Sequence, residues 1–191
     1  MNPLELFQNW FSEEENCNHL KLPRACCLST MGLDGYPNSR FVSFKEVVGD
    51  SLIITGSLNS QKGLEIENNP KVSLTFWWTA TERQVRIQGD VFIISKEAAN
   101  HYFEKRNRDS QIVSAIFKQG QEVESISHLQ HYFNQKKEEL LDNDIQRPEK
   151  WFGIAIHPVR IEFMEFKDTR LHERKSYTKT NAKWTEAILQ P

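Results

Sequence analysis

Four separated clusters of cationic and hydroxyl side chains could do chemistry in this sequence. The strongest is Arg170-Leu171-His172-Glu173-Arg174, in a stretch whose residues are typical of a β-strand. Alternation along a strand would place Arg170, His172 and Arg174 on one face. Three cationic or titratable side chains in a row on a sheet face are costly unless they are wet or face an anion. The pattern therefore indicates an anionic ligand.

A second cluster combines a phenol, a guanidinium and a hydroxyl. Tyr102 and Arg106 are four positions apart and share a helix face, and Ser110 lies about one turn further on if the helix continues. Because arginine binds phosphate oxygens in a bidentate manner, these three side chains could clamp a phosphate. Alternatively, Asp109 caps a following helix and Arg108 pairs with a carboxylate. The sequence leaves both interpretations open.

Two further clusters carry less information when each is taken alone. Arg40 and Lys45 lie five positions apart on one predicted strand, so a regular strand points them to opposite sides, and only a bend or strand end would bring both to one ligand. Ser60 and Lys62 begin a short predicted helix, where free backbone N–H groups, a hydroxyl and a cation can bind an anion. The structural alternatives are two solvated strand charges and a simple helix cap.

Other kinds of site are weak or absent in the sequence. Glycine-rich phosphate loops, G-x-S-x-G elbows and convincing Ser/His/Asp sets are missing, which counts against a hydrolase. His128 and His131 are three positions apart, but no further metal ligands accompany them, so we expect no metal site. Cys17, Cys26 and Cys27 form no C-x-x-C pair and are expected to be reduced thiols.

The composition is that of an ordinary soluble domain. The 191 residues carry a formal net charge of −2 and a pI near 6.3, which gives no general attraction to nucleic acid. No apolar run is long enough for a membrane span, and the first residues lack the basic start of a secretion signal. We therefore expect a cytoplasmic protein with neither a membrane nor a nucleic-acid partner. No linker or repeat divides residues 1–191, which predicts a single domain.

The elements that must position these clusters follow from apolar periodicity. Helices are predicted over residues 3–15, 60–69, 98–106, 110–118 and 125–141. Strands are predicted over residues 25–31, 40–47, 51–55, 72–78, 84–94, 151–156, 158–166, 170–178 and 184–189. Without βαβ alternation, this order favours a mainly β protein of the α+β class, an antiparallel β-barrel decorated by helices. The first helix is expected to cover an end of the sheet. Alternation should bury one of Trp77 and Trp78 and leave the other at a rim or interface.

Four motifs, taken together, resemble those of the pyridoxamine 5'-phosphate oxidase family. They are Glu67-Asn68-Asn69-Pro70, Glu82-Arg83-Gln84-Val85, Arg106-Asn107-Arg108-Asp109-Ser110-Gln111 and Arg170-Leu171-His172-Glu173-Arg174. Their order and spacing match over almost the whole chain. The resemblance implies a Greek-key split barrel that forms a homodimer with FMN at the interface. It also implies oxidation of pyridoxamine or pyridoxine 5'-phosphate to pyridoxal 5'-phosphate, with O2 as electron acceptor and H2O2 as product.

The resemblance further implies roles for individual residues. The FMN contacts that it implies are Arg40, Lys45, Thr55, Ser60, Gln61, Lys62, Gln84, Gln119 and Arg174. The substrate-binding residues that it implies are Lys45, Tyr102, Arg106, Ser110, Arg170 and His172. Of these, Arg170 and His172 would hold the substrate over the flavin and count as catalytic.

The chain departs from the family pattern at three positions. Gln61 stands where the family's S-R-K motif has arginine, and the lost charge-assisted contact would weaken FMN binding by about 1.5 to 3 kcal/mol if nothing compensates. Met164 stands where the family places a flavin-flanking tryptophan, and Glu173 replaces aspartate. Two alternatives remain. One is a flavin oxidase of the same fold that acts on another ring compound, as in phenazine biosynthesis. The other is a non-catalytic protein that binds FMN or pyridoxal phosphate.

Overall fold

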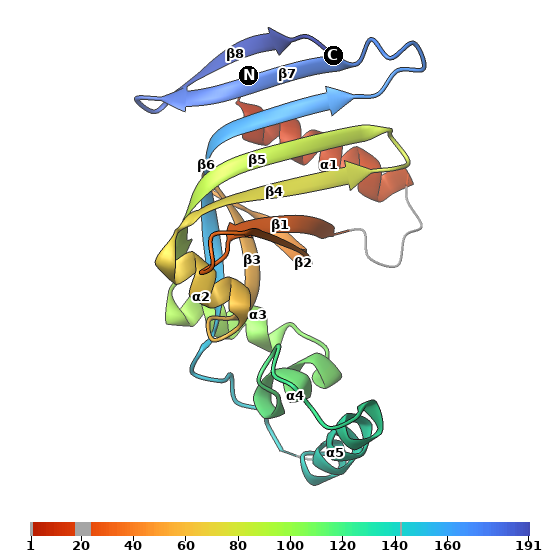
Figure 1. Cartoon of the computed structure of the whole chain (residues 1–191), viewed down its shortest axis with the longest axis vertical. Coiled ribbons are helices and arrows are strands. Elements are labelled where there is room, and N and C mark those ends of the chain that lie inside the picture. The colour runs from red at the N-terminus through yellow and green to blue at the C-terminus, as the bar shows by residue number, and fades with distance from the viewer. Residues whose placement is uncertain (1, 18–23, 142) are drawn as a thin grey trace.

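The computed structural model describes residues 2–17, 24–141 and 143–191. Within these residues the chain forms five helices and eight strands (Figure 1). The helices are α1 (Pro3–Cys17), α2 (Gln61–Asn68), α3 (Lys96–Glu104), α4 (Arg108–Ile116) and α5 (Ile126–Glu139). The strands are β1 (Ala25–Met31), β2 (Pro37–Val48), β3 (Ser51–Ser57), β4 (Lys71–Trp78), β5 (Arg83–Ile93), β6 (Trp151–Glu165), β7 (Glu173–Thr180) and β8 (Lys183–Leu189).

Six of the strands close into an antiparallel barrel. The sheet order runs β3-β2-β1-β4-β5-β6, and pairing of β3 with β6 closes the ring, while β7 and β8 extend the sheet from β6. Strands β1, β2 and β3 are consecutive neighbours, and β4 returns to lie beside β1, which is the Greek-key order. The predicted fold class, a helix-decorated antiparallel barrel, is confirmed.

The long strand β6 is where the barrel splits. One edge of β6 pairs with β5, whereas the other edge pairs with β3 over Trp151–Ile156 and with β7 over Arg160–Glu165. The prediction of two strands interrupted at His157 was wrong. Pro158 lacks an N–H group, but it lies between the two partners of this edge and beside the irregularity at Gln88–Gly89 of β5, where a missing ladder donor is tolerated.

Aromatic side chains fill the barrel and hold α1 against it. Alternation along β4 buries Phe76 and Trp78 and leaves Trp77 53% exposed. Phe7 of α1 packs against Phe44 and Phe76 with ring centroids 5.6 and 5.0 Å apart. Both expectations, a covering first helix and one buried tryptophan of the pair, are confirmed.

The other helices and the last hairpin occupy opposite ends of the molecule (Figure 1). Helix α2 connects β3 to β4, and α3, α4 and α5 follow β5 and lie far from β7 and β8. In the described part of the chain, no helix has the length and apolar character needed to cross a membrane. The predicted site residues fall in both of these parts, some where α2 to α4 meet the barrel and others near the last hairpin, so both are described below.

Candidate active site

A cavity of about 380 Å³ lies where β2, β3 and α2 meet the α4 region. It brings together six residues predicted from the sequence, which are Arg40, Lys45, Thr55, Lys62, Arg106 and Gln119. These residues span 80 positions of the chain, so only the fold can place them around one space. Their donors are cationic or amide N–H groups and a hydroxyl, which are the groups that bind phosphate.

Arg40 and Lys45 face the same cavity because β2 contains a bulge. Burial alternates regularly from Asn38 to Phe44, and then the phase slips by one residue, so that Lys45 follows Phe44 on the less exposed side. The pairing of β2 with β3 shifts register at the same place, between Phe44 and Val47. A bulge redirects side chains in this way. The regular-strand expectation, opposite faces for this pair, does not hold here.

Lys62 reaches into the cavity from the first turn of α2. Its Nζ donates hydrogen bonds to Ser60 Oγ at 3.0 Å and to Gln119 Oε1 at 3.1 Å. Burial lowers the pKa of Lys62, and the nearby charge of Arg40 lowers it further. Ser60 begins the helix, but its hydroxyl donates to Ser57 O at 2.6 Å instead of capping the helix, so the simple cap interpretation is not supported. Gln61 is exposed.

Arg106 enters the cavity from the loop between α3 and α4. Its Nη1 donates to Ser114 Oγ at 2.7 Å, and its guanidinium carbon lies 5.0 Å from the ring centroid of Trp151. Burial lowers the pKa of Arg106. The helix does not continue from Tyr102 to Ser110, because α3 ends at Glu104 and α4 begins at Arg108. Asn107 caps α4, and its side chain accepts a hydrogen bond from Ser110 N at 2.8 Å. Ser110 therefore lies on a new helix.

The alternative interpretation of the segment 107–109 predicted a following helix, which the structure has, but the cap and the partner of Arg108 differ from that prediction. Asp109 is not the cap, and it pairs with Lys137 at 2.8 Å. Among the described residues Arg108 pairs with no carboxylate, and its Nη2 donates instead to backbone carbonyls of residues 140, 141 and 143.

Tyr102 holds a carboxylate next to the cavity. Its hydroxyl donates to Glu46 Oε1 at 2.7 Å, and Glu46 follows the cavity residue Lys45 on β2. Burial raises the pKa of Tyr102 to about 12, with the hydrogen bond and the charge of Glu46 adding to the effect. The phenol is therefore a neutral donor at physiological pH, and an arriving phosphate would have to compete with Glu46 for it.

The cavity has an excess of positive charge. Arg40, Lys45, Lys62 and Arg106 all line it, whereas no carboxylate of the described residues does. Burial lowers the pKa of Lys45, and the charges of Arg106 and Arg24 add to this. Like charges held together in a partly buried space are unfavourable until an anion joins them. The arrangement is therefore suited to a multiply charged anion.

Eight of the predicted residues do not line this cavity, namely Ser60, Gln61, Tyr102, Ser110, Gln84, Arg170, His172 and Arg174. Gln84 lies on β5 opposite Met164 of β6, and its Nε2 is 3.9 Å from the Met164 sulfur. Arg174, on β7, donates to Glu162 Oε1 at 2.8 Å through Nη2 and at 3.2 Å through Nε. Arg174 thus belongs to the extension of the sheet beyond the barrel, whereas Gln84 lies on a strand of the barrel itself.

Arg170 and His172 precede β7 and are not part of it. The strand begins at Glu173, so the prediction of a strand over 170–178 that carries Arg170, His172 and Arg174 on one face was wrong. Arg170 adopts a φ of 67°, which ends the alternation of a strand, and its side chain is exposed. His172 accepts a hydrogen bond from Lys167 N at 3.1 Å and packs against Phe166 with centroids 4.9 Å apart. A turn therefore presents both residues.

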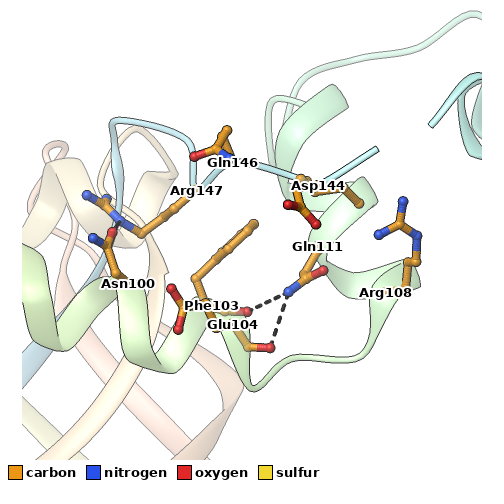
Figure 2. Close-up of a pocket in the computed structure, with 9 residues that line it drawn as sticks. Asn100, Phe103, Glu104, Arg108, Gln111, Asp144, Gln146 and Arg147 are labelled. Carbon is orange, nitrogen blue, oxygen red and sulfur yellow. Dashed lines mark hydrogen bonds between the residues drawn. The ribbon is translucent and has the colours of Figure 1, made fainter. Parts of the chain in front are cut away.

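A second hollow, of about 450 Å³, lies between α3, α4 and the segment 144–147 (Figure 2). Its lining mixes Arg108 and Arg147 with Glu104 and Asp144. Arg147 Nε donates to Asn100 Oδ1 at 2.6 Å, and its Nη1 donates to backbone carbonyls. Because this lining sets two arginines against two carboxylates, the hollow lacks the excess of positive charge found in the first cavity.

Comparison with known proteins decides the family. Residues 13–140 match the family model for pyridoxamine 5'-phosphate oxidase, and residues 151–191 match the pyridoxine 5'-phosphate oxidase C-terminal dimerisation region. The chain belongs to the pyridoxamine 5'-phosphate oxidase family. Proteins named pyridoxine/pyridoxamine 5'-phosphate oxidase share its sequence across its full length. One from Leptospira biflexa is 37% identical, covering 100% of this chain and 89% of the relative. One from Pelagibacter ubique is 35% identical, covering 100% and 92%.

Two solved structures share the fold. PhzG from Burkholderia lata, in complex with tetrahydrophenazine-1-carboxylic acid, superposes with a TM-score of 0.91 at 23% identity, covering 99% of this chain and 92% of that one. A pyridoxamine 5'-phosphate oxidase-related, FMN-binding protein from Nostoc punctiforme superposes with a TM-score of 0.80 at 18% identity, covering 97% of each chain. At these identities the likeness supports the barrel and not the substrate.

The sequence analysis did not identify three polar residues that lie at this site. Ser57 and Ser114 line the cavity, and Glu65 binds Arg40 from behind. Single serines near element ends carry no signal in a sequence. Glu65 falls within the predicted helix 60–69 and was assigned no role, although a glutamate three positions after a cavity lysine lies close to that lysine's helix face.

Proposed function

We propose that this protein is an FMN-dependent oxidase that converts pyridoxamine or pyridoxine 5'-phosphate to pyridoxal 5'-phosphate. One observation carries the proposal: two sets of phosphate-binding groups, Arg40 with Lys62 and Lys45 with Arg106, line one cavity. A flavin mononucleotide and a phosphorylated substrate bring two phosphates to one site. Membership of the pyridoxamine 5'-phosphate oxidase family supports an oxidase reaction.

The residues present fit the FMN phosphate. Lys62 and Arg40 offer charged donors, while Thr55 and Ser57 add hydroxyls on β3. Gly56 leaves room for the Lys62 side chain, because a Cβ at position 56 would lie 3.1 Å from Lys62 Cε and 3.2 Å from its Nζ. Gln119 already binds Lys62 and fixes the direction of its ammonium group. When bound, FMN would accept two electrons from the substrate's C4' position and pass them to O2, which yields H2O2.

Lys45, Tyr102, Arg106 and Ser110 would bind the substrate phosphate. Lys45 and Arg106 already face the cavity. Tyr102 would exchange its Glu46 partner for a phosphate oxygen, since its raised pKa keeps it a donor. Binding a remote dianion in this way orients the reacting carbon, which is how distant binding energy lowers a barrier.

Arg170, His172, Gln84 and Arg174 would complete the site from a second copy of the chain. Arg174 lies on β7, Arg170 and His172 lie in the turn before it, and Gln84 lies on the barrel strand β5. None of the four lines the cavity of its own chain. The segment 151–191 that carries Arg170, His172 and Arg174 matches a region described as a dimerisation region. We therefore propose a homodimer with FMN at the interface, in which each chain acts as one domain in the cytoplasm. Arg170 and His172 would close over the substrate ring.

The decisive experiment is an absorbance titration of the full chain. FMN is added, and pyridoxamine 5'-phosphate is then added without oxygen. We expect the flavin band to bleach, and to return with formation of H2O2 when O2 is admitted. Pyridoxamine without its phosphate is the matched control and should bleach the band only at far higher concentration.

Other outcomes would point to the alternatives. Bleaching by a reduced tricyclic phenazine precursor but not by pyridoxamine 5'-phosphate would replace the substrate and keep the flavin chemistry. A protein that binds pyridoxal 5'-phosphate yet shows no change in the FMN spectrum would be a binding protein and not an oxidase.

A further inference from the structure

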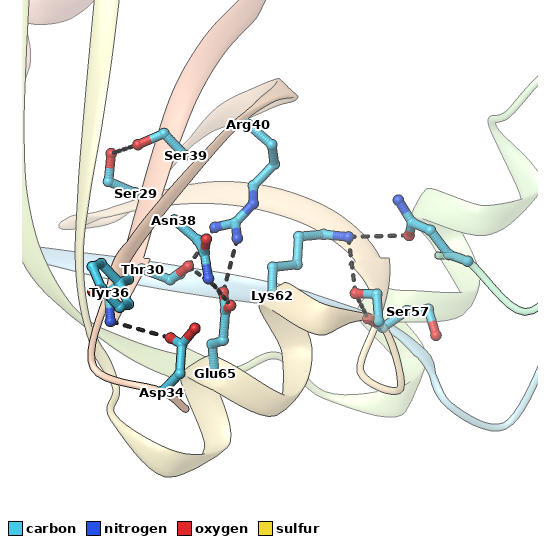
Figure 3. Close-up of polar contacts among 12 residues, drawn as sticks. Ser29, Thr30, Asp34, Tyr36, Asn38, Ser39, Arg40, Ser57, Lys62 and Glu65 are labelled. Atoms are coloured by element: carbon cyan, nitrogen blue, oxygen red, sulfur yellow. Dashed lines mark hydrogen bonds and ion pairs between the residues drawn. The ribbon is translucent and has the colours of Figure 1, made fainter. Parts of the chain in front are cut away.

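We propose that Glu65 is a positioning residue that holds the Arg40 guanidinium toward the FMN phosphate. This inference rests on the proposed function, because it assumes that FMN occupies the cavity. Figure 3 shows Arg40 and Lys62 extending above α2, with Glu65 beneath the Arg40 guanidinium. Arg40 lines the cavity, whereas Glu65 does not. Any effect of Glu65 on a ligand must therefore act through another residue.

Every oxygen of Glu65 is engaged by a donor. Its side chain is 1% exposed. Oε2 accepts from Thr30 Oγ1 at 2.5 Å and from Arg40 Nη2 at 2.8 Å, and Oε1 accepts from Asn38 Nδ2 at 2.5 Å. Arg40 Nη1 also donates to Thr30 Oγ1. The guanidinium is thus held at two nitrogens by a buried carboxylate and a buried hydroxyl.

The contacts with Glu65 and Thr30 fix the direction of the Arg40 guanidinium as well as balancing its charge. Buried carboxylates require paired donors, and an arginine side chain loses much of its rotamer freedom when it is bound at two nitrogens. Arg40 is 25% exposed, so one side faces Glu65 and the other remains open to the cavity. Burial would raise the pKa of Glu65, but hydrogen bonds from Thr30, Asn38 and Arg40 outweigh it and hold the pKa below its ordinary value. Glu65 therefore stays ionised at neutral pH.

Arg40 and Lys62, the two cations that would face the FMN phosphate, have different partners in the protein. Lys62 and Glu65 are three positions apart on α2, yet Lys62 binds Ser60 and Gln119 instead of Glu65. Glu65 is therefore available to Arg40 and does not neutralise Lys62. Because Gln61 is exposed and carries no charge, the FMN phosphate depends on Arg40 and Lys62 in this wall, and the aim of Arg40 matters more.

The test compares FMN with riboflavin, which lacks only the phosphate. Dissociation constants are measured by flavin fluorescence on the full apo chain for the wild type, Glu65→Gln and the matched control Glu67→Gln, an exposed residue of the same helix. We expect Glu65→Gln to weaken FMN binding by at least about tenfold and riboflavin binding by less than about twofold. Glu67→Gln should change neither constant.

A double variant tests whether Glu65 acts through Arg40. In an Arg40→Gln background, Glu65→Gln should weaken FMN binding no further. If Glu65→Gln fails to fold, Thr30→Val removes the bridging hydroxyl while keeping the carboxylate, and it should show the same selective loss for FMN in smaller measure.

Three outcomes would overturn the inference. FMN binding that is not weakened in Glu65→Gln would mean that the carboxylate does not hold Arg40 toward the phosphate. Equal losses for FMN and riboflavin would show a purely structural role. A wild-type chain that binds neither flavin would overturn the proposed function together with this inference, whereas the first two results leave the proposed function intact.

Discussion

The cavity near α2 and the turn before β7 handle positive charge in opposite ways. In the cavity, Lys45, Lys62 and Arg106 are crowded cations whose pKa values lie below their ordinary values. Around the turn, Lys167 pairs with Glu165 and Glu173, which raise its pKa, and Arg174 pairs with Glu162. The cavity is prepared for an anion within one chain. Around the turn these cations are paired, whereas Arg170 is exposed and, in the proposed dimer, would act on the second chain.

The largest expected effect separates the two regions by function. Arg170→Leu should lower turnover by about 10²-fold, because a residue that orients the reacting group contributes on that order. FMN content should stay nearly unchanged, because Arg170 lies outside the cavity. Turnover and the flavin-to-protein absorbance ratio are measured on the same sample. Equal losses in both would erase the division between the regions.

The next effect lies in the cavity and concerns the substrate phosphate. Arg106→Gln should raise KM for pyridoxamine 5'-phosphate by about tenfold or more, since it removes a charge-assisted phosphate contact. Arg108→Gln is the control, because Arg108 binds backbone carbonyls of the α5 end and does not line the cavity. Steady-state kinetics would contradict the assignment if the two variants raised KM alike.

Restoring the family's arginine sharpens the description of the cavity as a phosphate site. Gln61→Arg should tighten FMN binding by about tenfold, which corresponds to one charge-assisted hydrogen bond. Riboflavin binding should not change, and fluorescence titration measures both. An unchanged FMN constant would show that position 61, exposed at the start of α2, does not reach the phosphate.

The smallest effect is a proton count. The pKa of Lys62 lies below its ordinary 10.5 in the free protein, and a bound phosphate favours the charged form and raises this pKa. At alkaline pH, between the pKa of Lys62 in the free protein and its higher pKa in the FMN complex, FMN binding should therefore add a fraction of a proton to Lys62. Over that range the affinity for FMN should fall as pH rises. Calorimetry at several alkaline pH values, each in two buffers of different ionisation enthalpy, measures the uptake. Lys62→Met should take up less.

The barrel could be predicted from sequence because its strands alternate clearly. The regular burial of β4, with Phe76 and Trp78 inside and Trp77 outside, is a local property of the sequence. The continuity of β6 could not be predicted, because proline normally ends a ladder and only the neighbouring irregularity in β5 makes Pro158 tolerable.

Six of the predicted site residues line one cavity, but the geometry that brings them together could not be predicted. Arg40 and Lys45 meet only because of a bulge that depends on pairing between β2 and β3. The alternating Arg170-x-His172-x-Arg174 spacing imitates a strand, and the positive φ of Arg170 that breaks it has no signature in a residue type that normally avoids it. Glu65 becomes significant only once β1 and β2 are placed against α2.

The shared edge of β6 has a consequence for the architecture of the monomer. The segment that the second family model describes as a dimerisation region begins at Trp151, which is also the first residue of β6. A chain truncated before that residue would leave β3 and β5 each with an unpaired edge, and Trp151 would be missing from beside Arg106. The C-terminal region is therefore a structural requirement of the single subunit before it can serve any association between two.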